Sequence, residues 1–139
     1  MILLDTAGLY AVLNDREPAH EAAANALSAE APPYLLSPFV LAELDYLLMD
    51  HSSGTAESRL LRDVAQRAYQ LELFGPEDVA VALLVVERYA DLNIGLADAS
   101  IVVLAGRYDT NRVLTLDERH FRALRTTSGK KFTILPADA

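Results

Sequence analysis

Cysteine is absent from the 139 residues, which excludes disulfides, zinc–thiolate sites and thiol nucleophiles and fits a reducing compartment. Long hydrophobic runs are absent too: the longest purely apolar run, residues 79–86, is far shorter than the ~20 residues that cross a bilayer. At the N-terminus a carboxylate closely follows a short apolar run, with no basic segment ahead of it, which does not fit a signal peptide. We therefore expect a soluble, cytoplasmic protein that does not enter membranes.

Basic residues are few, because 12 Lys and Arg stand against 20 Asp and Glu, for a formal net charge of −8. Affinity for nucleic acid comes largely from Lys and Arg, so this balance argues against a protein that simply coats a polyanion. Residues 107–139 are the exception, with seven Lys and Arg and four Asp and Glu. We expect that segment to form either a basic rim that faces phosphate or a solvated surface of mixed charge.

Short apolar runs alternate with helical patterns along the whole chain, which favours a mostly parallel sheet covered by helices on both faces. We expect strands at residues 2–4, 34–36, 69–74, 112–116 and 132–135. We expect helices after residue 6 and at 20–27, 38–50, 56–68, 76–91, 98–106 and 117–124, with a loop at 52–54. The predicted fold is a single α/β domain over residues 1–139, a three-layer sandwich around a central, mostly parallel five-stranded sheet.

Two acids lie where predicted strands give way to helices. Asp5 follows the first apolar run, and Asp117 follows residues 112–116. The carboxyl ends of parallel strands meet at one edge of the sheet, where open α/β folds bind ligands. Helix capping is the alternative for both acids: Asp5 can cap the helix that follows it, and Thr115 with Glu118 fits a capping box around Asp117.

Two further acids have apolar neighbours at helical spacing. Asp98 is preceded by Ile94 and followed by Ile101 and Val102. Burial of an unpaired carboxylate costs several kcal/mol, so we expect Glu43 to face the protein interior and to need a cation or a proton. A salt bridge to a distant arginine is the alternative for Glu43, and N-capping is the alternative for Asp98. The neighbours of Glu43 one turn away on each side are Phe39, Val40, Tyr46 and Leu47.

Four carboxylates without a soft ligand suit a hard cation such as Mg²⁺ or Mn²⁺. Such ions polarise phosphate and lower the pKa of a bound water, so phosphodiester hydrolysis is the economical interpretation of the set. The three histidines show no ligand spacing and are expected at the surface, although His120 lies three residues after Asp117 and is a candidate substrate contact. The chain has no glycine-rich phosphate loop, no Gly-x-Ser-x-Gly elbow and no His-Glu-x-x-His helix.

The acids occur within four short motifs that have the order and spacing of a known family. Each motif alone is weak, but the ordered set spans the chain. It resembles the PIN-domain ribonucleases, and specifically the VapC-type toxins of prokaryotic toxin–antitoxin pairs. The motifs are residues 3–6 (LLDT), 37–44 (SPFVLAEL), 96–101 (LADASI) and 113–121 (VLTLDERHF).

The resemblance implies an endoribonuclease that depends on Mg²⁺ or Mn²⁺ and has a cognate VapB-like antitoxin as its partner; such proteins commonly form homodimers. Thr115 falls where the family places a supporting hydroxyl, and Thr6 adjoins the first acid. A metal-activated water would attack an RNA phosphate. By resemblance the catalytic, metal-binding acids are Asp5, Glu43, Asp98 and Asp117, of which Asp117 varies most in role. The basic rim would contact the RNA backbone through Arg112, Arg119, Arg122 and Arg125.

Two other classes of function are open at the level of sequence. A CheY-like receiver domain also gathers acids at the carboxyl edge of a parallel sheet, but it needs an acidic pair after the first strand and a phosphorylatable Asp after the third. Here the first strand ends in a single Asp, and residues 69–74 are followed by Gly75 and Pro76. A non-catalytic PIN-like binding protein is the stronger alternative, and metal-dependent RNA cleavage separates it from a ribonuclease.

Overall fold

Five short parallel strands form the centre of the protein, in a computed structural model that describes residues 1–51 and 54–139. Every pair of neighbouring strands is parallel, and the order across the sheet is β3-β2-β1-β4-β5. The earliest strand in the sequence is therefore the central one. The strands are β1 (Ile2–Leu4), β2 (Tyr34–Leu36), β3 (Gln70–Leu71), β4 (Arg112–Leu114) and β5 (Thr133–Leu135).

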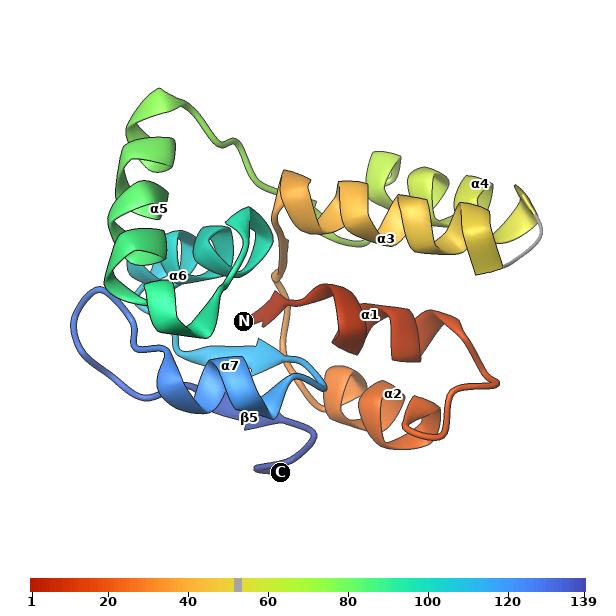
Figure 1. The fold of residues 1–139 in the computed structure, drawn as a ribbon. Coiled ribbons are helices and arrows are strands. Elements are labelled where there is room, and N and C mark those ends of the chain that lie inside the picture. The colour runs from red at the N-terminus through yellow and green to blue at the C-terminus, as the bar shows by residue number, and fades with distance from the viewer. Residues whose placement is uncertain (52–53) are drawn as a thin grey trace.

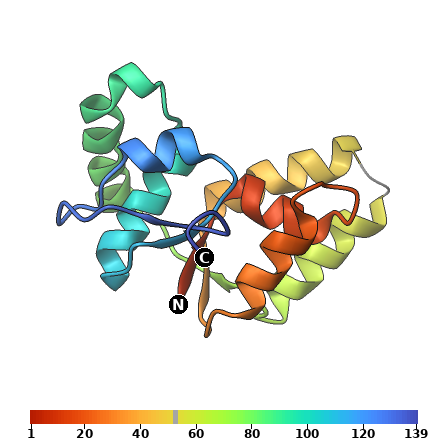
Figure 2. The same ribbon diagram turned by 90° about the horizontal axis from the view of Figure 1, so that it is seen from below.

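Helices lie on both sides of this sheet. One group, α1–α4, lies to one side of the strands and a second group, α5–α7, lies to the other (Figure 1), and the view from below shows the same division (Figure 2). The helices are α1 (Thr6–Leu13), α2 (His20–Ser28), α3 (Pro38–His51), α4 (Gly54–Ala65), α5 (Pro76–Arg88), α6 (Leu96–Tyr108) and α7 (Glu118–Ala123), with a short 3₁₀ helix η1 (Ala90–Leu92) before α6.

The strands β1, β2, β4 and β5 are mainly apolar because the sheet is covered there on both faces, whereas both residues of the edge strand β3 are exposed. Every residue of β1 is fully buried, as expected for a central parallel strand that has no solvent-facing side. One continuous hydrophobic cluster joins residues of β1, β2, β4 and β5 with the inner faces of the helices. Within the described residues, no helix combines the length and the apolar character needed to cross a membrane.

The expected α/β architecture, with its central five-stranded sheet, is confirmed, and its sheet is entirely parallel. The third strand is shorter than expected, because β3 holds only two residues before the chain leaves the sheet. The helix expected to start at Asp98 begins two residues earlier, with Gly95 as its N-cap. The loop expected at 52–54 was wrong at residue 54, which begins α4, and residues 52 and 53 lie outside the described part of the chain.

Candidate functional site

Asp5 lies at the carboxyl end of the central strand and is almost completely buried, with 5% of its surface exposed. Its backbone N–H donates to Leu114 O at 3.0 Å, which joins the end of β1 to the end of β4. The hydroxyl of Thr115, the residue after β4, donates to Asp5 Oδ2 at 2.6 Å. Gly8 permits this close approach, because a Cβ at that position would lie 2.3 Å from Leu114 O.

Burial raises the pKa of Asp5 from 3.8 to about 7. The Thr115 hydrogen bond lowers the pKa, whereas the negative charges of Asp98 and Asp117 raise it further. Among the described residues, no lysine, arginine or histidine forms an ion pair with Asp5. A carboxylate in this position is therefore held at the edge of the sheet without a positive partner from the described residues.

Glu43 reaches the same edge from α3, where Thr6 Oγ1 donates to its Oε1 at 2.8 Å. The prediction that Glu43 faces the protein interior was wrong, since the residue is exposed. The apolar neighbours of Glu43 did not indicate burial, because one of them, Tyr46, is itself 67% exposed. The buried stripe of α3 consists instead of Val40, Leu44 and Leu48, and Glu43 lies next to it.

Asp98 lies in the first turn of α6, where the helix dipole favours an anion. Burial raises its pKa, contacts with His120 lower it, and the charges of Asp117 and Glu43 raise it.

A buried hydroxyl pair fixes the two helices that carry Glu43 and Asp98. Ser37 Oγ, which accepts from Phe39 N at the start of α3, lies 2.6 Å from Ser100 Oγ in α6.

Asp117 caps α7. Its Oδ1 accepts from His120 N at 3.1 Å, and its own backbone N–H donates to Thr115 Oγ1 at 2.9 Å. The expected capping box had placed Thr115 at the cap position, which was wrong by two residues. Thr115 instead uses its hydroxyl to link Asp5 to the backbone of Asp117.

The four acids line one open pocket of about 270 Å³. Thr6 and His120 also line it, and the remaining walls are small or apolar residues. All four acids are oxygen donors, which suit a hard divalent cation. Within residues 1–51 and 54–139, however, no three acid or histidine side chains converge closely enough to form a ready-made ligand set. The pocket therefore gathers the four acids along one lining without a preformed cluster of three ligands among the described residues.

Comparison with known proteins identifies this arrangement. The family model described as "PIN domain" matches residues 2–126. The chain belongs to the PIN domain family.

Among curated proteins, this PIN domain is 42% identical over 135 residues to Ribonuclease VapC26 of Mycobacterium tuberculosis, covering 97% of this chain and 100% of that protein. Its fold matches the crystal structure of VapC20 from M. tuberculosis with a TM-score of 0.79 at 17% identity, over 85% of this chain and 91% of the other. It also matches a toxin–antitoxin complex from Klebsiella pneumoniae with a TM-score of 0.70 at 18% identity, over 89% of this chain and 92% of the other.

The four predicted rim arginines of this PIN domain lie in different settings. Arg112 begins β4, at the edge of the sheet opposite the acids, and pairs there with Glu30. Arg122 pairs with Asp138 and Glu118. Arg125 donates to three carbonyl oxygens at the end of α7. Arg119 is exposed next to the pocket residue His120, and its side chain makes no hydrogen bond or ion pair within the described part of the chain. Only Arg119 therefore combines a free guanidinium with a position beside the site.

His120 lies in the site, although the sequence did not indicate that it contacts the acids. It was expected at the surface, yet its side chain is only 20% exposed and its Nδ1 contacts both Asp98 and Asp117. The spacing of three residues from Asp117 on a helix was the available signal, because residues at i and i+3 are neighbours. The contact with Asp98 was not visible in the sequence, because it depends on how α6 and α7 lie together.

Proposed function

We propose that this PIN domain is a VapC-type toxin that hydrolyses RNA phosphodiesters with a divalent cation, Mg²⁺ or Mn²⁺, bound at Asp5, Glu43 and Asp98. The observation that carries the proposal is the state of Asp5. Burial together with neighbouring acids raises its pKa to about 7, and no cation from the described chain compensates it. Keeping a carboxylate in such a place costs folding free energy, and a bound cation offsets that cost.

The likeness to VapC26 supports the reaction, because that relative is named a ribonuclease and is matched over its full length. Ribonucleases of this kind depend generally on a divalent metal. When bound, such an ion supplies positive charge for the phosphate and makes a water more acidic. It also offsets the repulsion that four carboxylates in one pocket would exert on an RNA phosphate.

The residues around the pocket have separate roles in this proposal. Asp5 and Asp98 bind the cation from the end of β1 and from the first turn of α6. Glu43 binds it from α3, with Thr6 orienting its carboxylate. Thr115 orients Asp5 and ties it to the backbone of Asp117. Asp117, at the N-cap of α7, orients water or a second ion.

The proposal also includes a partner protein, which two of the structural matches support. The Klebsiella structure is a toxin–antitoxin complex, and a further structural match is FitAB bound to a DNA fragment, with a TM-score of 0.63 at 19% identity. We propose that a VapB-like antitoxin binds this chain and that the chain forms a homodimer. VapC20 is described as a toxin that cleaves the sarcin–ricin loop.

RNA cleavage by purified variants tests the function. Wild type is expected to cut end-labelled RNA in Mg²⁺ or Mn²⁺ and to stop in EDTA. Asp5→Asn and Asp98→Asn are each expected to slow cleavage by about 100-fold or more, because each removes charge that holds the cation. Asp15→Asn, which makes the same change at an exposed position, serves as the control and should cut at the wild-type rate.

Cleavage that survives Asp5→Asn at the rate of the Asp15→Asn control would remove Asp5 from the site. Cleavage that EDTA leaves unchanged would remove the metal. A well-folded wild type that cuts no RNA in either ion would favour the non-catalytic binding protein instead.

A further inference from the structure

One ring nitrogen of His120 connects two of the four acids. Its Nδ1 lies 2.9 Å from Asp98 Oδ2 and 3.1 Å from Asp117 Oδ2. The backbone N–H of the same residue donates to Asp117 Oδ1 at 3.1 Å. Asp98 comes from α6 and Asp117 caps α7, so His120 joins acids that lie on different elements.

The chemistry of the contact fixes which ring nitrogen carries the proton. A lone pair on Nδ1 would face two carboxylate oxygens, which are acceptors, so we assign the hydrogen to Nδ1, which donates it to Asp98 Oδ2 and lies within ion-pair distance of Asp117 Oδ2. The other ring nitrogen, Nε2, makes no hydrogen bond within the described residues. The contact therefore depends on a donor at the Nδ1 position and not on the imidazole ring as a whole.

The two acids differ in how many of their carboxylate oxygens contact His120. Both carboxylate oxygens of Asp117 lie against His120: Oδ1 accepts from its backbone N–H, and Oδ2 lies within ion-pair distance of the ring Nδ1. Asp98 gives only Oδ2 to the histidine, and its Oδ1 has no hydrogen-bond partner among the described residues. Asp98 thus keeps one oxygen outside this contact, whereas both oxygens of Asp117 lie against His120.

We propose that His120 is a positioning residue that orients Asp98 for direct binding of the divalent cation and holds Asp117 at a fixed distance from it. This inference rests on the proposed function of the pocket. It divides the acids into direct ligands, which include Asp98, and Asp117, which His120 holds in place to orient water or a second ion. Hydrogen bonds to ligating carboxylates typically change metal affinity by about 10–100-fold when they are removed.

Three substitutions separate this role from simple packing of α7. Asn at position 120 can place its amide nitrogen near the position of Nδ1, Gln places it nearer to Nε2, and Ala removes the donor. His120→Asn is expected to bind Mn²⁺ within a few-fold of wild type. His120→Gln and His120→Ala are expected to bind it about 10–100-fold more weakly.

The control acts on the same helix without touching the acids. Phe121 is fully buried beside Phe132, with the ring centroids 5.4 Å apart, so Phe121→Leu loosens the packing of α7. Phe121→Leu should lower the melting temperature yet keep wild-type Mn²⁺ affinity. If His120 only attached α7 to α6, the His120 variants and Phe121→Leu would instead behave alike.

The measurement is calorimetric titration of each variant with Mn²⁺, accompanied by thermal melts without metal. Weak binding by the Ala and Gln variants, with rescue by Asn, supports the positioning role. Equal Mn²⁺ affinity in wild type and all three variants overturns the positioning role. A loss of affinity in the Asn variant as large as that in the Ala variant also overturns it. Either result leaves the proposed function standing. A wild type that binds no Mn²⁺ overturns both.

Discussion

Asp5 and Glu72 occupy equivalent places in the sheet but have opposite surroundings. Each is the first residue after a parallel strand, Asp5 after the central β1 and Glu72 after the edge strand β3. Each is buried, with 5% and 7% of its surface exposed. Burial alone therefore does not distinguish them, and the difference lies in the groups that each carboxylate meets.

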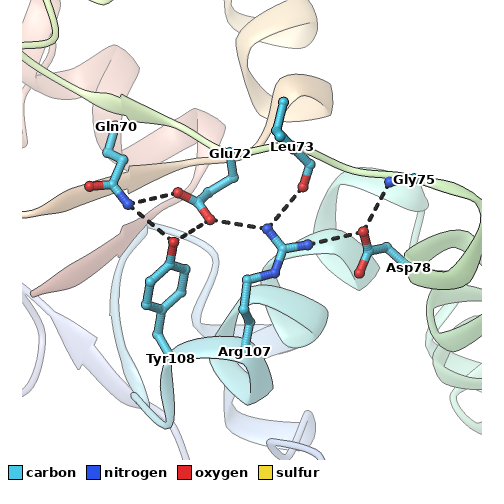
Figure 3. A network of polar contacts seen from close by, with 7 residues as sticks. All are labelled: Gln70, Glu72, Leu73, Gly75, Asp78, Arg107 and Tyr108. Carbon is cyan, nitrogen blue, oxygen red and sulfur yellow. Dashed lines mark hydrogen bonds and ion pairs between the residues drawn. The ribbon is translucent and has the colours of Figure 1, made fainter.

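Glu72 meets donors and a cation, as Figure 3 shows. Tyr108 Oη donates to its Oε1 at 2.6 Å, Arg107 Nη1 donates to the same oxygen at 3.0 Å, and Gln70 Nε2 donates to Oε2 at 2.8 Å. Arg107 also binds Asp78 and the carbonyl of Leu73, which attaches the chain after β3 to α5 and α6 (Figure 3). This network is complete within the protein.

The pKa values of the two acids follow from these contacts. Burial raises the pKa of Glu72, but the hydrogen bonds from Tyr108, Gln70 and Arg107 outweigh it, so its pKa is lowered. Burial raises the pKa of Asp5, and its acidic neighbours add to that rise. The comparison indicates that Glu72 has a structural role, because its cation is built in. Asp5 is suited to bind a cation that comes from solution.

The largest expected difference is in the stability of the metal-free protein when each acid becomes an amide. At pH 8, Asp5→Asn should stabilise on the order of 2–4 kcal/mol, because it removes a buried charge whose ionisation is unfavourable. Glu72→Gln should destabilise by about 1–3 kcal/mol, because it removes the charged acceptor of Arg107 and Tyr108. Denaturant unfolding of both variants in EDTA measures the two changes.

The gain from Asp5→Asn should also depend on pH. Between pH 3.8 and about 7 the folded protein holds a proton on Asp5 that the unfolded chain has lost, so wild-type stability falls as pH rises through this range. Below pH 4 both states are protonated, and the advantage of the amide should disappear. Destabilisation by both amides, or a gain from Asp5→Asn that is the same at pH 4 and pH 8, would contradict the comparison.

The smallest expected effect concerns Arg119, which unlike Arg107 has no carboxylate partner within the described residues. If it contacts RNA, Arg119→Glu in an Asp98→Asn background should weaken RNA binding and flatten the plot of log K against log salt by about 0.7. Lys131→Glu makes the same change in charge just before β5, at the edge of the sheet opposite the acids, and serves as the control. Equal effects of the two reversals would exclude a specific contact at Arg119.

Much of the fold could be predicted because it depends on local patterns. Buried parallel strands are short apolar runs, and the carboxyl ends of such strands meet at one edge, which is why Asp5 and Asp117 could be placed near each other. Glu43 was assigned to the same edge for a wrong reason, since its apolar neighbours do not bury it. Its place in the pocket depends on Thr6 and on the packing of α3, which the helical pattern alone does not specify.

The features that were missed depend on contacts between distant segments. Nothing near Glu72 in the sequence indicates that Arg107 will neutralise it, because the pair forms only when α6 packs beside the chain after β3. The bridge from His120 to Asp98 likewise spans two helices. Arg112 looked like part of a basic rim, but the direction of β4 places it at the far edge with Glu30.

The central claim is that the acids of the pocket bind a divalent cation, and thermal melts with and without Mn²⁺ test it most directly. Because the ion binds the folded state, Mn²⁺ at 100 times its Kd should stabilise wild type by about 2.7 kcal/mol. Glu43→Gln, which removes one proposed ligand from an exposed position, should lose most of that gain while keeping its fold, and Glu72→Gln should retain it. An equal Mn²⁺-induced shift in wild type and Glu43→Gln, or no shift in wild type, would contradict the account.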